Sequence, residues 1–174
     1  EKYGGSFFHV VTGIQITGID KDDKEALIAE LPDGVTTVIH RGVNSLIACV
    51  GKGKCKNGQM ETAELADYIE RKHYGRKTSH KCKIGISGCG RNCPDSMVKD
   101  IAFIGTSQGF MLAVGGNTGM RPEAGKILMR KLSVEQAKKA ADILIDWYAE
   151  NGEPKERIGK LLERLGNPLE NKTL

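Results

Sequence analysis

Four cysteines fall into two pairs whose spacing could hold a metal. Cys49 and Cys55 are separated by five residues, and Cys89 and Cys93 by three. Thiolates are soft ligands for zinc and for iron–sulfur clusters. The spacing differs from the two-residue knuckles of structural zinc sites and from the closely spaced run of ferredoxins. We expect all four to be metal ligands, and the alternative is four buried thiols without a metal.

Glycines surround these cysteines. They are Gly51, Gly53, Gly85, Gly88 and Gly90. Glycine lets backbone amides come close to the sulfides of a cluster, where they donate hydrogen bonds. The pattern therefore favours a cluster in a loop over thiols in a core. Cys82 has no partner at ligand spacing, and we expect a core thiol or a thiol near the cluster.

The composition excludes several classes of protein. The 174 residues are 39% hydrophobic, and no apolar run approaches the roughly 20 residues that cross a bilayer, so we expect no membrane-spanning role. A net charge of +4 suits an anionic ligand, but aromatic residues are only 5% and we expect no nucleic acid partner. The odd number of cysteines, without a secretory signal, favours reduced thiols and a cytoplasmic location.

The pattern of apolar residues predicts strands that alternate with helices. Strands are expected over 7–19 (one or two, broken near Gly13), Val35–His40, Ser45–Val50, Lys83–Ser87, Asp100–Gly105 and Gly109–Gly115. Helices are expected over 21–31 and 62–74, from a capping box at Ser133, and from Pro154 to Gly166. The segment 51–60 is expected to be a loop. This order indicates an α+β or α/β domain.

A family resemblance rests on the second cysteine pair and its surroundings. The run KIGISGCGRNC, from Lys83 to Cys93, follows the Cys49-x5-Cys55 pair and resembles the cluster-binding motifs of the siroheme-dependent nitrite and sulfite reductases. Asp100–Gly105 and 114–122 resemble later segments of that family in the same order. The resemblance extends from about residue 45 to residue 158.

The resemblance implies a cofactor pair and a ligand set. Cys49, Cys55, Cys89 and Cys93 would hold a 4Fe-4S cluster, and Cys93 would also bridge the cluster to the siroheme iron, which makes Cys93 the catalytic cysteine. The implied fold is α+β, a mixed sheet with flanking helices. Residues 45–174 would form the 4Fe-4S and siroheme-binding domain, preceded by a ferredoxin-like half-repeat over 1–44.

Siroheme carries many carboxylates, so its pocket should contain cations and amide donors, arginine above all. The expected cofactor-binding residues are Arg41, Lys52, Lys54, Arg91, Asn92, Asn117 and Arg121. Val11 stands where the family carries an arginine that helps to bind the anionic substrate. Either Arg41 or one of the lysines replaces that arginine, or a second copy of the chain or a missing second half completes the pocket.

The implied activity is the six-electron reduction of sulfite, or of nitrite, at siroheme coupled to the cluster. The substrate is then a small oxyanion, and a ferredoxin-like acidic protein is the expected electron donor. The alternative is an iron–sulfur electron-transfer or scaffold subunit without catalytic activity.

Overall fold

The computed structural model describes residues 6–10, 13–17, 19–31, 41–170, 172 and 174. The chain divides into two compact units, Glu1–Ile39 and His40–Leu174. The boundary expected from the sequence, after residue 44, falls inside the first strand of the second unit. Val11 and the strand expected over Val35–His40 lie outside the described residues.

The first unit contains a hairpin and a helix. Strands β1 (Ser6–Val10) and β2 (Gly13–Thr17) pair in antiparallel fashion, and helix α1 (Lys21–Ala29) follows. Acidic residues in the first turn of α1 complement the positive end of its dipole. The two strands and the helix expected from the sequence are confirmed.

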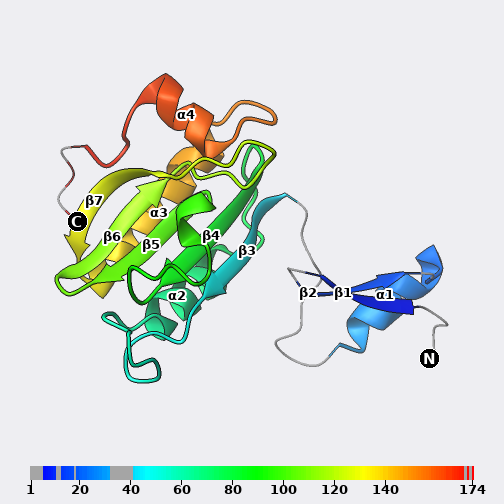
Figure 1. The fold of residues 1–174 in the computed structure, drawn as a ribbon. Helices are drawn as coiled ribbons and strands as arrows, with labels where there is room; N and C mark the ends of the chain where they lie inside the picture. Colours follow the sequence, from blue (N-terminus) through cyan, green and yellow to red (C-terminus); the bar gives the residue numbers. More distant parts are fainter. Residues whose placement is uncertain (1–5, 11–12, 18, 32–40, 171, 173) are drawn as a thin grey trace. The chain divides into compact units, whose positions relative to one another are not determined.

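The second unit is built on a five-stranded sheet in the order β3-β4-β5-β6-β7 (Figure 1). The strands are β3 (Gly42–Ala48), β4 (Lys81–Ser87), β5 (Ile101–Thr106), β6 (Gly109–Val114) and β7 (Lys126–Leu132). β3, β4 and β5 are parallel, whereas β6 and β7 are antiparallel to their neighbours. The fold is therefore α+β with a mixed sheet, as expected.

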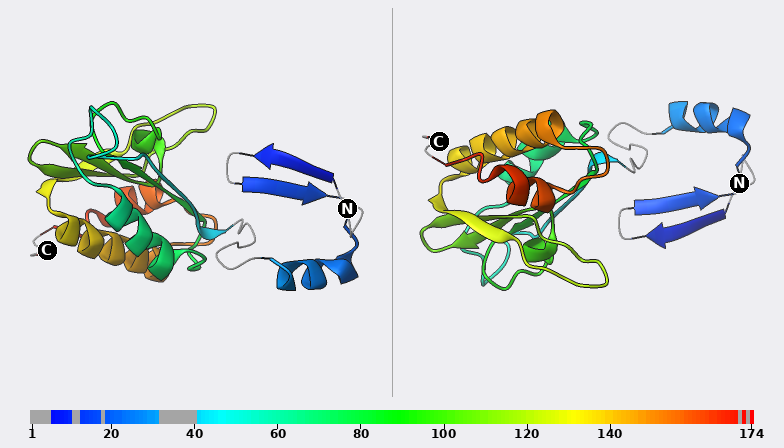
Figure 2. Two further views of the ribbon diagram at one scale, coloured as in Figure 1. Left: turned by 90° about the horizontal axis from the view of Figure 1, so that it is seen from below. Right: turned by 90° about the horizontal axis from the view of Figure 1, so that it is seen from above.

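Helices α2 (Ala63–His73) and α3 (Val134–Asn151) lie side by side on one face of this sheet (Figure 2). The predicted capping box at Ser133 starts α3, since its hydroxyl accepts from the Gln136 amide and the Gln136 side chain accepts from the Ser133 amide. A short 3-10 helix, η1 (Ser96–Val98), and helix α4 (Ile158–Leu165) complete the unit. None of the described helices is long and apolar enough to cross a membrane.

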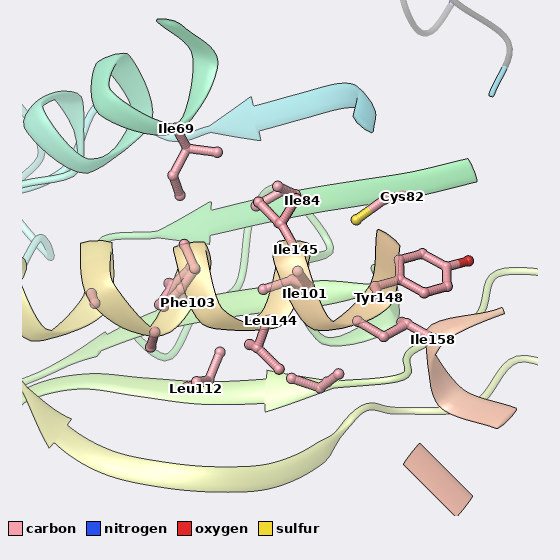
Figure 3. Close-up of a cluster of buried hydrophobic side chains, with 14 of the residues drawn as sticks. Ile69, Cys82, Ile84, Ile101, Phe103, Leu112, Leu144, Ile145, Tyr148 and Ile158 are labelled. Atoms are coloured by element: carbon pink, nitrogen blue, oxygen red, sulfur yellow. The ribbon is translucent and has the colours of Figure 1, made fainter. Parts of the chain in front are cut away.

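The core lies between α3 and the sheet. Figure 3 shows Ile84, Ile101 and Phe103 from the strands facing Leu144 and Ile145 of α3, and all five side chains are fully buried. Alternate residues of the strands face the other side of the sheet, where Ala102, Ile104 and Ala113 form a second, smaller buried cluster.

Cys82 lies in this core, at the beginning of β4, and is fully buried (Figure 3). Burial raises the pKa of the Cys82 thiol well above its ordinary value, so the thiol stays protonated. Of the two expectations for this cysteine, the structure supports the core thiol.

Two elements differ from the sequence-based expectation. α4 begins at Ile158 and not at Pro154, because Lys155 has a φ of 69° and Arg157 is extended. The Tyr148 and Ser79 hydroxyls both donate to the Glu156 carbonyl and hold that turn. β7 was not predicted. This edge strand is largely exposed and carries charged residues at both ends, so its apolar and polar residues do not alternate as they do in a half-buried strand.

Candidate metal centre

The two cysteine pairs follow the carboxyl ends of two neighbouring strands. Cys49 directly follows β3, and Cys89 lies two residues beyond the end of β4. β3 and β4 are parallel neighbours, so their carboxyl ends meet at the same edge. The Cys49 amide donates to the Ile86 carbonyl at 3.0 Å. The fold thus brings the two loops that carry the cysteines together.

Backbone hydrogen bonds fasten the Cys55 loop to the end of β4. The amides of Gln59 and Met60 both donate to the Gly88 carbonyl, at 2.8 and 3.0 Å. Within the loop, the Cys55 amide donates to the Gly51 carbonyl at 3.0 Å. The segment that carries Cys55 is therefore held against the residue before Cys89.

Glycines make this contact between backbones possible. A Cβ atom on Gly88 would lie 2.7 Å from the Gly51 Cα atom, and a Cβ on Gly105 would overlap the Gly88 carbonyl. Gly51 itself has a φ of 64°. Three segments, the Cys55 loop, the end of β4 and the end of β5, can approach this closely only without side chains.

Two further hydrogen bonds hold Cys49. The Gly88 amide donates to the Cys49 sulfur at 3.0 Å, a contact of the kind that backbone amides make with metal-bound sulfur. The Thr62 hydroxyl donates to the Cys49 carbonyl, and Thr62 is only 1% exposed. Sequence reasoning missed the role of Thr62, although a threonine at the start of the expected helix 62–74 could have marked it as an anchor.

The second pair lies in a turn with unusual backbone angles. Asn92 and Asp95 flank Cys93-Pro94 and have φ values of 54° and 52°, a region that asparagine and aspartate tolerate better than other residues. Cys93 is exposed, whereas Cys49, Cys55 and Cys89 are partly buried. All four are free thiols. The turn thus presents Cys93 outward.

The arrangement suits a cluster better than a single ion. Among the described residues, no three histidine, cysteine or acidic side chains lie close enough to share one metal ion. Tetrahedral zinc draws its thiolates to about 3.8 Å from one another. A 4Fe-4S cluster instead bonds each thiolate to a different iron, so its four cysteines are spread around a cube. Four free thiols on two fastened loops, with an amide already directed at one sulfur, fit that group.

Some of the expected cofactor-binding residues lie in the cysteine loops. Lys52 and Lys54 flank Gly53 in the Cys55 loop, and Arg91 lies between Cys89 and Cys93; all three side chains are exposed. In the part of the chain that the structure describes, none of the three has an ion-pair partner. Asn92 is half-buried, and its side-chain oxygen accepts from the Met97 amide at 3.3 Å.

The other three expected residues lie outside the cysteine loops. Arg41 precedes β3, a strand of seven residues, so the length of that strand separates it from Cys49. Asn117 and Arg121 belong to the loop after β6, whose first residue, Gly115, donates to the Asp100 carbonyl at the start of β5. The loop of Asn117 and Arg121 packs against η1, because a Cβ atom on Gly116 would lie 2.5 Å from the carbonyl oxygens of Met97 and Lys99.

Comparison with known proteins identifies an iron–sulfur domain. The family model described as the nitrite and sulphite reductase 4Fe-4S domain matches residues 40–168. The assimilatory-type sulfite reductase of Nitratidesulfovibrio vulgaris is 30% identical over 167 residues, which cover 95% of this chain and 77% of that protein. An NAD(P)H nitrite reductase of Bacillus subtilis is 31% identical and matches 88% of this chain, but the match spans only 19% of that longer protein.

Solved structures share the fold. The crystal structure of dissimilatory sulfite reductase I has a TM-score of 0.77 at 14% identity, over 94% of this chain and 61% of that chain. The NirA protein of Mycobacterium tuberculosis has a TM-score of 0.63 at 18% identity, over 72% of this chain and 25% of that one. The family model covers most of the chain and describes an iron–sulfur domain. The chain therefore belongs to the nitrite and sulphite reductase 4Fe-4S domain family, a family of oxidoreductases.

Proposed function

We propose that Cys49, Cys55, Cys89 and Cys93 hold a 4Fe-4S cluster and that Cys93 also contacts the iron of a siroheme. The observation that carries the proposal is the pair of cysteine loops fastened at one sheet edge, with Cys93 exposed beyond the other three. When bound, the cluster supplies single electrons, and the siroheme iron supplies the position at which an oxyanion is reduced.

The chain's own residues hold and orient these groups. The Gly88 amide donates to the Cys49 sulfur, and the Thr62 hydroxyl holds the Cys49 backbone. Lys52, Lys54 and Arg91 are exposed beside the cysteines, where their positive charges offset those of siroheme carboxylates and attract an anionic substrate.

We infer that the substrate is sulfite, with nitrite as the second choice. The sulfite reductase of Nitratidesulfovibrio vulgaris is matched over 77% of its length, whereas the Bacillus subtilis nitrite reductase is matched over 19%. Both substrates are small oxyanions that need a cationic pocket.

The electron donor is proposed to be a small acidic redox protein of the ferredoxin type. The chain has a net charge of +4, and Lys56 is a further exposed lysine in the loop around Cys55, so an acidic surface would be attracted to it. Reduced thiols and a 4Fe-4S cluster both favour a reducing compartment, and we propose the cytoplasm.

We also propose that a second copy of this chain, or a further half, completes the siroheme pocket. Arg41 lies at the other end of β3 from Cys49, and Asn117 and Arg121 belong to the loop after β6, so none of the three lies in the cysteine loops. A neighbouring copy could supply these residues. Light scattering on the active protein tests this proposal, because a strict monomer with full activity would contradict it.

The reductase function is tested by assaying the anaerobically purified protein with reduced methyl viologen. Production of sulfide from sulfite, in a protein whose spectrum contains both siroheme and iron–sulfur absorption, is the expected result. The position of Arg41 at the other end of β3 from Cys49 favours a second candidate, an electron-transfer subunit without siroheme. A cluster spectrum without tetrapyrrole absorption and without sulfide production would support that candidate.

A further inference from the structure

We propose that Asn92 is a positioning residue, which holds the turn of Cys89 and Cys93 in its ligating shape through a buried hydrogen-bond relay from Ser96 and Ser87. The inference rests on the proposed function, since it concerns the same cluster ligands. It gives Asn92 a different role from the cofactor contact expected from the sequence.

The backbone of Asn92 connects both cysteines of the pair. Its amide donates to the Cys89 carbonyl at 3.2 Å, and its carbonyl accepts from the Asp95 amide at 2.8 Å. Asn92 therefore ends one turn, which starts at Cys89, and begins the next, which contains Cys93. Its φ of 54° links the two turns, and a residue confined to negative φ would direct Cys93 elsewhere.

The side chain of Asn92 is held by hydrogen bonds from Ser87 and Met97. Its Oδ1 atom accepts from the Met97 amide at 3.3 Å and from the Ser87 hydroxyl at 3.4 Å. The Ser87 and Ser96 hydroxyls are 2.8 Å apart, and these serines are 1% and 0% exposed. Because Oδ1 can only accept, Ser87 donates its one proton to Asn92, and Ser96 must donate to Ser87.

The relay ends on β4 itself. Ser87 is the last residue of β4, and Ser96 packs against Gly85, where a Cβ atom would lie 2.7 Å from the Ser96 Cα atom. The chain thus leaves β4, forms the turn with both cysteines and returns to the same strand. The hydrogen bonds of Asn92 therefore tie the cysteine turn to a rigid strand. Residues that contact metal ligands commonly fix the orientation of those ligands in this way.

Three substitutions at Asn92 separate its two contributions. Asn92→Gly keeps the positive φ and removes the side-chain acceptor, Asn92→Asp keeps both, and Asn92→Ala removes the acceptor and disfavours the angle. Ser96→Ala removes the first donor of the relay. Lys155→Ala is the matched control, because Lys155 also has a positive φ, of 69°, in a loop far along the chain from the cysteines.

The measurement is the rate at which the full chain, loaded anaerobically with iron and sulfide, loses iron to a chelator, with the melting temperature recorded beside it. We expect loss about tenfold faster in Asn92→Ala, an intermediate rate in Asn92→Gly and Ser96→Ala, and a wild-type rate in Asn92→Asp. Lys155→Ala should lower the melting temperature without changing the rate.

Two results would overturn the role. If the wild-type chain holds its cluster and Asn92→Gly and Ser96→Ala lose iron at the wild-type rate, the relay does not position the cysteines. If the wild-type chain takes up no cluster at all, the proposed function fails, and the role of Asn92 fails with it.

Discussion

At the scale of single residues, the environment of each cysteine decides what its thiol can do. Cys82 is fully buried in the core, where burial raises its pKa and keeps it protonated. Cys49 receives a hydrogen bond from a backbone amide, and Cys93 is exposed. The same side chain is thus an inert core thiol at one position and a candidate ligand at another.

The glycines beside the cysteines offer a prediction at this scale. Gly88→Ala should lower the free energy of unfolding by about 1–3 kcal/mol, because the new Cβ would lie 2.7 Å from the Gly51 backbone and push the loops apart. The iron content after reconstitution should fall with it. Chemical denaturation and an iron assay measure the two effects.

Gly90→Ala is the matched control, because a Cβ at that position meets nothing within 4 Å. This variant should keep its stability to within about 0.5 kcal/mol and its iron content. Equal losses in the two variants would show that close packing at Gly88 is not what holds the loops.

At the scale of elements, α2 and α3 are joined through one carboxylate. Asp142 of α3 accepts hydrogen bonds from the Tyr68 hydroxyl and the Lys72 ammonium, both at 2.7 Å, and lies 2.6 Å from the His73 Nε2 atom. His73 is only 1% exposed. These contacts hold α2 against α3. Because α2 follows directly on the Cys55 loop, they also help to fix the position of that loop.

We predict that Asp142→Asn lowers the free energy of unfolding by about 1–2 kcal/mol at pH 7. Burial alone would raise the pKa of Asp142, but the hydrogen bonds from Lys72, His73 and Tyr68 hold it below its ordinary value. A lowered carboxyl pKa stabilises the fold above the unfolded-state pKa of about 3.9, and this stability is lost as the pH falls through the folded-state pKa.

The difference between wild type and Asp142→Asn should therefore shrink on acidification from about pH 5 to pH 3. Urea denaturation at several pH values measures it. Asp67→Asn serves as the control, because the Asp67 pair with Arg71 is 59% and 79% exposed and contributes little. A difference that stays constant over this pH range would contradict the assigned pKa shift.

Most elements were predictable from sequence because their signals are local. The Ser133 capping box and the apolar strand residues depend on neighbours within a few positions. β7 was not predictable, because it is an exposed edge strand. The start of α4 was not predictable either, because it depends on the positive φ of Lys155, whose amide donates to the carbonyl of the distant Ser79. The position of Arg41 at the far edge from Cys49 is set by strand direction, which spacing alone does not reveal.

At the scale of the whole molecule, the described chain forms two units, and the cysteines all lie in the second. The main core cluster of that unit extends from Val43 to Leu169. The family model begins at residue 40, at the same division. The second unit thus has the core that an independent domain needs, together with all of the proposed cluster ligands.

We predict that a protein of residues 40–174 folds by itself. Its melting temperature should lie within about 4 °C of that of the full chain, since about 1 kcal/mol shifts a domain of this size by 2–4 °C. It should also take up the same iron per chain. Calorimetry of the two proteins checks the first statement, and a noncooperative transition in the shorter one would contradict it.

The most direct test of the central claim compares two cysteine variants of the full chain. After anaerobic reconstitution, wild type and Cys82→Ala should bind about four irons per chain and show iron–sulfur absorption. Cys93→Ser should lose cluster iron and any coupling to siroheme. If Cys93→Ser instead kept the wild-type iron content and spectrum while Cys82→Ala lost them, the assignment of Cys49, Cys55, Cys89 and Cys93 as the cluster ligands would be wrong.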